Sequence, residues 1–178
     1  MILPGNPIDA GVRIRTYSGQ YIDVFDIQLN EIYIDDIAHA LSNQTRFAGH
    51  CVRHYSVAEH CINVAELVPD ELKLEALLHD AAETYIIDMP APIKSMFPEY
   101  REIENNLMKM IAKKFNINWP VHSKVKQADK ICLLKEWDDN VINDNLKNHL
   151  PLSPKEAKQK FLECFYKYRN IHTEKTDI

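Results

Sequence analysis

The sequence predicts a mainly α-helical bundle with a small β-hairpin near the N-terminus. The chain has 178 residues, of which 46% are hydrophobic, and this is enough to bury a core. It contains only four glycines, and from residue 35 onward apolar residues recur at helical spacing between capping patterns. We expect one domain, made of an N-terminal arm and hairpin (1–34), a helical core (35–140) and a C-terminal helix and tail (141–178).

Two short strands are expected before the first helix. Residues 14–17 and 21–25 are rich in β-branched and aromatic side chains, and they flank the turn pair Ser18-Gly19. Because a two-stranded hairpin is only marginally stable in water, it should lie against the helices.

The first two helices have recognisable starts. Asp35 or Asp36 can cap the first helix. Ser56 and Glu59 form a capping box for the second helix. In the second helix, His60 lies one turn from apolar residues on either side, so its imidazole should face the core.

The segment 71–94 holds an adjacent His79-Asp80 pair in an apolar stretch. The first half of this segment is apolar nearly all round, which is typical of a buried helix. Ionisable groups in such a helix are costly unless they are paired or bind an ion. In a continuous helix Glu83 would share one side with His79 and Asp80, and Asp88 follows just before a proline break. This concentration of donors favours a metal site over a neutral core histidine beside a helix-terminal carboxylate.

Three more helices are expected after the proline break. Pro98 begins an amphipathic helix that ends by Trp119-Pro120, and the last helix begins at a capping box in residues 153–156. Between them lies a helix whose apolar stripe includes Asp129 and Glu136, and a carboxylate in that place needs a partner. For Glu136 we consider two partners, namely support of Asp129 or pairing with a neighbouring lysine.

Inward-facing polar residues thus stand on three separate segments: His60, His79-Asp80 and Asp129. The helices of a bundle can bring such residues together in the core. Two imidazoles and two carboxylates suit a borderline divalent ion with open positions for water better than a closed tetrahedral zinc site. The alternative is that these residues form separate buried pairs, because spacing alone does not establish that they converge.

The order H…HD…D is joined by HDxxE at residues 79–83 and by DxPxPxK at residues 88–94. Over about residues 13–140 the chain resembles the HD-domain metal-dependent phosphohydrolases, in the branch of bacterial 5′-deoxynucleotidases and phage deoxynucleotide phosphohydrolases. The resemblance implies an HD-domain helical bundle that holds one divalent cation (Co, Mn, Zn, Mg, Fe or Ni). The ligands that it implies are His60, His79, Asp80 and Asp129.

The resemblance also implies roles for five further residues. Glu83 and Asp88 would be catalytic, since a carboxylic group can orient the attacking water or protonate the leaving oxygen. Arg46 would contact the substrate phosphate, and Lys94 would add positive charge near the phosphates. Phe47 stands where the deoxynucleotidases place a tryptophan near the sugar, so their selection against a 2′-hydroxyl does not transfer directly.

The predicted function is metal-dependent hydrolysis of (deoxy)nucleotides, either as a 5′-nucleotidase or as a dNTP triphosphohydrolase that prefers dATP. In the phage enzymes the hairpin approaches the base, which by analogy assigns Tyr21 or Ile22 to base contact. The alternatives are hydrolysis of another phosphoester, such as an alarmone or a cyclic nucleotide, and nucleotide binding without catalysis.

Charge and cysteine spacing narrow the expected partners. The net charge of −5 and the lack of a long basic run argue against a nucleic-acid binder. The four cysteines show no CxxC spacing, and the sequence has neither a signal peptide nor an apolar run of about 18 residues. We therefore expect a cytoplasmic protein with reduced thiols and no membrane partner. The resemblance adds a small-molecule nucleotide substrate and a homo-oligomer, either a dimer or a larger ring.

Overall fold

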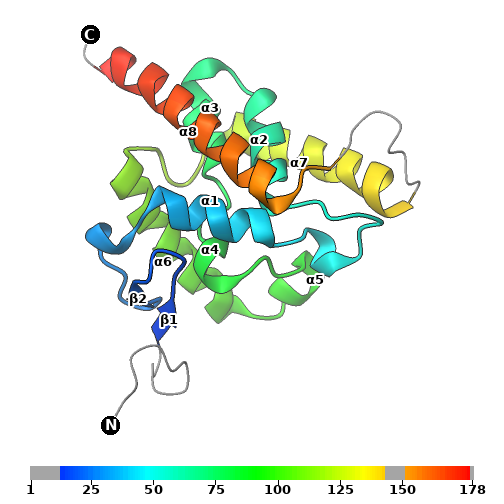
Figure 1. The fold of residues 1–178 in the computed structure, drawn as a ribbon, viewed down its shortest axis with the longest axis horizontal. Helices are drawn as coiled ribbons and strands as arrows, with labels where there is room; N and C mark the ends of the chain where they lie inside the picture. The colour runs from blue at the N-terminus through cyan, green and yellow to red at the C-terminus, as the bar shows by residue number, and fades with distance from the viewer. Residues whose placement is uncertain (1–12, 143–150, 177–178) are drawn as a thin grey trace.

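The described chain is mainly helical, with one small antiparallel hairpin near its N-terminus, as the sequence predicts (Figure 1). The computed structural model describes residues 13–142 and 151–176, with side chains up to residue 171 in the last helix. The expected N-terminal arm (1–12) and the end of the expected tail lie outside the described residues. The elements are β1 (Arg13–Arg15), β2 (Tyr21–Asp23), α1 (Ile34–Asn43), α2 (Val57–Glu66), α3 (Lys73–Leu77), α4 (Glu83–Ile86), α5 (Ala91–Lys94), α6 (Pro98–Phe115), α7 (Ser123–Trp137) and α8 (Pro154–Thr176).

The hairpin is fastened to α1 by an aspartate that we expected to cap that helix. In the register of β1 and β2, Ile14 lies opposite Ile22. The carboxylate of Asp36 accepts hydrogen bonds from the Ser18 main-chain amide at 2.6 Å and from the Ser18 hydroxyl at 2.7 Å. Asp36 is only 1% exposed, so this tether is part of the core. The prediction that Asp35 or Asp36 caps this helix was wrong, because both residues already lie in the first turn of α1 and Tyr33 stands at the N-cap position.

Helix α2 lies at the centre of the helical packing. It packs against α1, α3, α7 and α8, and α8 also lies across α1 and α3 (Figure 1). The predicted capping box is confirmed: the Ser56 hydroxyl accepts from the Glu59 amide at 3.2 Å, and the Glu59 carboxylate accepts from the Ser56 amide at 3.1 Å. The other Glu59 oxygen accepts from the Leu152 amide at 2.9 Å, which ties the start of α2 to the segment before α8.

Residues 71–83 do not form the continuous helix that the apolar pattern in the first half of segment 71–94 predicts. Helix α3 ends at Leu77, a turn follows, and α4 begins only at Glu83. The Ala76 carbonyl accepts from His79 Nδ1 at 2.7 Å, whereas in a regular helix it would accept from the amide of residue 80. Local helix propensity is overridden here by a bond that turns His79 and its neighbour toward the interior.

The three later helices follow the prediction with small differences at their ends. Helix α6 ends before Asn116, whose φ of 56° is left-handed, and so stops before Trp119-Pro120. Helix α8 begins at the predicted capping box, in which the Glu156 carboxylate accepts from the Ser153 amide at 2.9 Å. Its Phe161, Phe165 and Tyr168 side chains are buried in the core.

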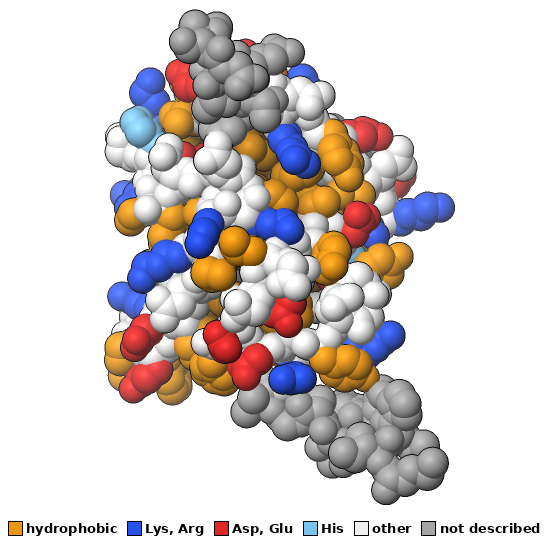
Figure 2. Space-filling view, turned by 90° about the vertical axis from the view of Figure 1, so that its left-hand side faces the viewer, with side chains coloured by type: hydrophobic (Ala, Val, Ile, Leu, Met, Phe, Trp, Pro, Cys, Tyr) orange, Lys and Arg blue, Asp and Glu red, His pale blue; other side chains and the backbone are white. Residues whose placement is uncertain are grey.

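The surface and the helix lengths add two observations. No helix in the described ranges is both long and apolar enough to cross a membrane. On the face shown in Figure 2, Lys and Arg side chains are scattered among acidic and apolar ones rather than gathered into one patch.

Candidate metal centre

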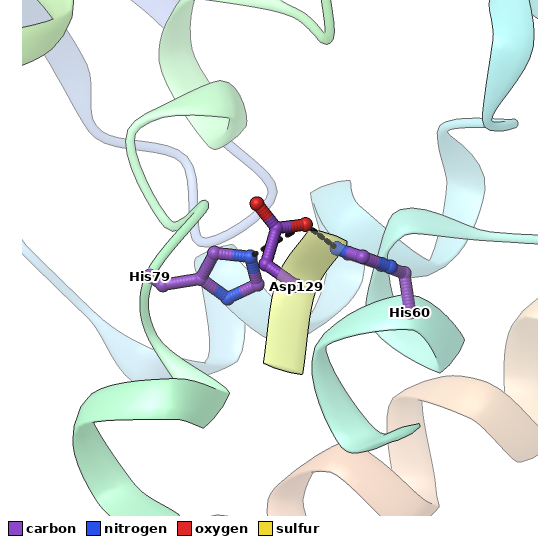
Figure 3. A group of neighbouring side chains, drawn as sticks. All are labelled: His60, His79 and Asp129. Carbon is purple, nitrogen blue, oxygen red and sulfur yellow. Dashed lines mark ion pairs between the residues drawn. The ribbon is translucent and has the colours of Figure 1, made fainter. Parts of the chain in front are cut away.

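Four predicted ligands from three parts of the chain converge at one point. His60 comes from α2, His79 and Asp80 from the turn between α3 and α4, and Asp129 from α7. His60 Nε2 lies 3.1 Å from the Asp129 carboxylate and 3.6 Å from that of Asp80. His79 Nε2 lies 3.3 Å from the Asp80 carboxylate and 3.9 Å from that of Asp129. Figure 3 shows the two imidazoles directed at the Asp129 carboxylate from either side.

The hydrogen bonds of the two imidazoles leave their Nε2 atoms available. Nδ1 of His60 lies 2.9 Å from a carboxylate oxygen of Glu136, and Nδ1 of His79 lies 2.7 Å from the Ala76 carbonyl. Since both partners only accept, each Nδ1 carries the proton and donates it. Both Nε2 atoms are buried, and neither has a hydrogen-bond partner among the described residues. Histidines that bind metals are held in this way, with the second ring nitrogen donating to a carboxylate or carbonyl.

The spacing of these atoms fits a shared cation. Donors about 2.1 Å from one ion lie about 3.0 Å apart at a right angle and about 3.4 Å apart in a tetrahedron. Two of the four separations, 3.1 and 3.3 Å, fall within that range, and the other two, 3.6 and 3.9 Å, are somewhat longer. His60, His79 and Asp129 could therefore hold a metal ion, with Asp80 beside them. The alternative of separate buried pairs does not describe this arrangement, because each imidazole faces both carboxylates.

Charges within the cluster reinforce one another. Burial lowers the pKa of His79, but the Asp80 carboxylate and contacts with Asp129 and Cys61 raise it well above its usual value. Burial raises the pKa of Asp129, but the two imidazoles hold it well below its usual range. The carboxylates thus favour positive charge between the rings, and a cation bound at Nε2 would take the place of a proton there.

Glu136 supports His60 and not Asp129. Its carboxylate lies 2.9 and 3.1 Å from His60 Nδ1, accepts from the Tyr55 hydroxyl at 2.7 Å and lies 3.2 Å from the Arg46 guanidinium. Burial raises the pKa of Glu136, but these partners bring it below its usual value. Both partners proposed from the sequence were therefore wrong. The helical stripe showed that Glu136 is buried, but it carried no information about which element faces it.

Arg46 lies at the edge of the cluster. Only 7% of Arg46 is exposed. Its guanidinium lies 3.2 Å from the Glu136 carboxylate, 3.9 Å from the Asp80 carboxylate and 5.3 Å from the centre of the Phe47 ring. Its Nε has no hydrogen-bond partner in the described part of the chain. Phe47 packs edge-on against Trp137 at 5.5 Å. The structure therefore places two of the three predicted substrate residues, Arg46 and Phe47, in contact with each other at the edge of the candidate centre.

The two predicted catalytic carboxylates have distinct environments. Glu83 is 4% exposed, and burial and the Asp80 charge raise its pKa well above the usual value. Burial also raises the pKa of Asp88, although Arg46 opposes the shift. Lys94 lowers the pKa of both groups, but its ammonium forms an ion pair with Glu104 and lies 5.4 Å from the Tyr100 ring. Lys94 is thus near the carboxylates but already paired within α5 and α6.

The prediction that a hairpin residue contacts the base was wrong for Ile22. Ile22 is fully buried in the core, so it does not present its side chain to a ligand. Tyr21 has a buried hydroxyl without a partner in the described residues, and its assignment to base contact stays a prediction.

Comparison with known proteins places the chain in a family. The chain matches no protein-family model. It is 38% identical to the uncharacterized protein YfdR of Escherichia coli K12 over 165 residues, which are 85% of this chain and 93% of YfdR. The chain belongs to the YfdR family. An uncharacterized protein of Rhodobacter capsulatus is 33% identical over 126 residues, 65% of this chain and 64% of its own length. A 5′-deoxynucleotidase of Pasteurella multocida is 29% identical over 110 residues, 51% of this chain and 55% of its own length.

Two features of this YfdR-family site were missed in the sequence. Cys61, His79 and Asp80 form a second group of donor atoms within 4.8 Å of one another, although burial raises the pKa of Cys61 to about 11. Tyr55 bonds Glu136 and is itself held by the Asn63 amide, which donates to its hydroxyl at 2.7 Å. The only sequence signal for either feature was its closeness to His60.

Proposed function

We propose that this protein is a metal-dependent phosphohydrolase of the HD type that acts on deoxynucleotides. The observation that carries the proposal is the convergence of two buried imidazole nitrogens with the carboxylates of Asp80 and Asp129. The partial similarity to a 5′-deoxynucleotidase supports the same reaction class. A nucleoside 5′-monophosphate is the substrate that we favour, and a dNTP that loses triphosphate is the second candidate.

The residues present fit such a cation and its substrate. His60, His79, Asp80 and Asp129 would hold the ion, which when bound neutralises phosphate charge and makes a water molecule more acidic. Arg46 can bind a phosphate oxygen through its unpartnered Nε, because a guanidinium donates in a planar, charge-assisted geometry. Its present acidic contacts keep the guanidinium in place beside the candidate ligands.

The environments of the two carboxylic groups suggest a division of roles. Burial and the charge of Asp80 raise the pKa of Glu83 well above its usual value, which favours the protonated form that can give a proton to the leaving oxygen. Asp88 is less perturbed and feels the opposing charge of Arg46, so it is the better candidate to accept a proton from the attacking water. Paired acids whose surroundings separate their pKa values divide the acid and base roles in this way.

A nucleotide panel with metal analysis tests the proposal. Purified protein is assayed for bound metal and for phosphate, pyrophosphate or triphosphate released from deoxy- and ribonucleotides. His79→Ala should lose both the metal and the activity, whereas replacement of the exposed His50 should leave both unchanged. Full activity in a metal-free His79→Ala protein rejects the proposal. Nucleotide binding without turnover in the wild type would identify a non-catalytic protein.

A further inference from the structure

Gln44 lies where three parts of the site meet. It directly follows α1, and its main-chain carbonyl accepts from the Val57 amide at 3.0 Å, at the first turn of the helix that carries His60. Two residues later comes Arg46, whose amide donates to the Tyr55 carbonyl at 2.9 Å. The main chain around Gln44 is therefore fixed both to α1 and to the start of α2.

The side-chain amide of Gln44 uses both of its ends on another segment. Its Nε2 donates to the main-chain carbonyl of Glu83 at 2.9 Å. Its Oε1 accepts from the main-chain amide of Asp88 at 3.0 Å. One amide thus bonds the main chain of both candidate catalytic residues, from a place about 40 residues away in the sequence.

Residues 83–88, which the Gln44 amide connects by these two hydrogen bonds, contain an unfavourable backbone conformation. Ile87 has φ of 66° and ψ of 153°, and a positive φ is costly for a β-branched residue. Such conformations persist only where surrounding contacts hold them. The Tyr100 hydroxyl donates to the carbonyls of Ile86 and Ile87 on this turn. Gln44 also holds this turn, through Glu83 before Ile87 and Asp88 directly after it.

We infer that Gln44 is a positioning residue for Glu83 and Asp88. The inference rests on the proposed function. Gln44 touches neither carboxylate group. It sets the separation and orientation of the two main-chain points from which these side chains extend, relative to the helix that carries His60. A displacement of a catalytic group by about 1 Å can lower the rate about 100-fold. The two hydrogen bonds of Gln44 therefore matter for catalysis even though Gln44 contributes no reacting atom.

The test compares Gln44→Met with Gln28→Met. Methionine nearly matches glutamine in length and shape but cannot form either hydrogen bond. Gln28 is a control because its amide also donates to a main-chain carbonyl, that of Asp26 at 3.0 Å, in a turn that lies outside the candidate centre. Bound metal, melting temperature, kcat and KM are measured on the nucleotide that the wild type hydrolyses best. For Gln44→Met we expect kcat to fall about 100-fold, with KM changed by less than about threefold and bound metal unchanged.

Each outcome decides the question. Wild-type kcat in a folded Gln44→Met protein overturns the inference, and so does a loss of bound metal equal to the loss of activity, because that would show a general structural role. If Gln44→Met does not fold, Gln44→Asn replaces it, since its amide is one methylene too short to span both groups and the same fall in kcat is expected. If the wild type binds metal but hydrolyses no nucleotide, the proposed function itself is rejected. If the wild type is active and the Gln44 variant is equally active, only the inference about Gln44 is rejected and the proposed function stands.

Discussion

Replacing Glu136 with glutamine should weaken metal binding, although Glu136 is not one of the four candidate ligands. Its carboxylate accepts the Nδ1 proton of His60 at 2.9 Å and lies 3.2 Å from Arg46. This bond fixes the tautomer in which His60 Nε2 presents a lone pair to a cation. Glutamine keeps the shape of the side chain but removes the negative charge that makes His60 a strong ligand.

The size of the effect follows from the contacts that are lost. Removal of a residue that supports a metal-binding histidine typically costs 10- to 100-fold in metal affinity, which is about 1.4 to 2.8 kcal/mol. Two features place Glu136→Gln near the upper end. Glu136 is only 5% exposed, so water does not screen the change. Arg46 also loses a counter-charge 3.2 Å away, so its own positive charge opposes the cation more strongly.

The assay is a competition titration of metal-free protein against a chelator of known affinity, with Mn²⁺ or Co²⁺ as the probe. Glu75→Gln is the matched control, because Glu75 is 3% exposed and accepts from the Asn118 amide at 3.1 Å but lies outside the candidate centre. We expect wild-type affinity in Glu75→Gln and about 100-fold weaker binding in Glu136→Gln. Equal affinities in the two variants would refute the reasoning.

Three further predictions follow from single contacts. Because burial raises the pKa of Glu83 above its unfolded value of about 4.5, its ionisation destabilises the fold as pH rises. The melting temperature of Glu83→Gln should therefore exceed that of the metal-free wild type at pH 7 but not at pH 4, by about 3 °C for each kcal/mol of destabilisation removed, and kcat should fall at least about 100-fold. Scanning calorimetry at both pH values and a rate assay measure these changes. An unchanged melting temperature at pH 7 would contradict the prediction. Arg46→Lys should lower kcat/KM about 30-fold by removing a directed bond to phosphate, and steady-state kinetics showing an unchanged value would exclude that contact. Asp36→Ala should lower the free energy of unfolding, measured by denaturant titration, by about 2 kcal/mol, because the Ser18 amide loses its acceptor at 2.6 Å. The control Asp35→Ala changes an exposed position and should cost little. Equal losses in the two variants would refute the role of Asp36 in holding the hairpin.

Local signals predicted most of the helices and the types of residue at the site. The capping boxes at Ser56 and Ser153 marked the starts of α2 and α8, because the groups that satisfy a helix end lie within a few residues of it. Burial of His60 and Glu136 followed from helical periodicity, which depends only on spacing along one segment. The family resemblance supplied the grouping of His60, His79, Asp80 and Asp129, and the structure brings these four side chains together.

The sequence by itself determined where helices could form and which polar groups would need partners inside the protein. Only the tertiary structure decided which partners they found: Glu136 with His60, Asp36 with the hairpin, and Gln44 with the turn before Asp88. The folded structure also decided that the helix in segment 71–94 ends at Leu77, where the Ala76 carbonyl accepts from the His79 side chain, instead of continuing through His79 and Asp80. The physical reason is that helix propensities differ by less than about 1 kcal/mol per residue, whereas a buried hydrogen bond or ion pair between distant segments is worth as much or more.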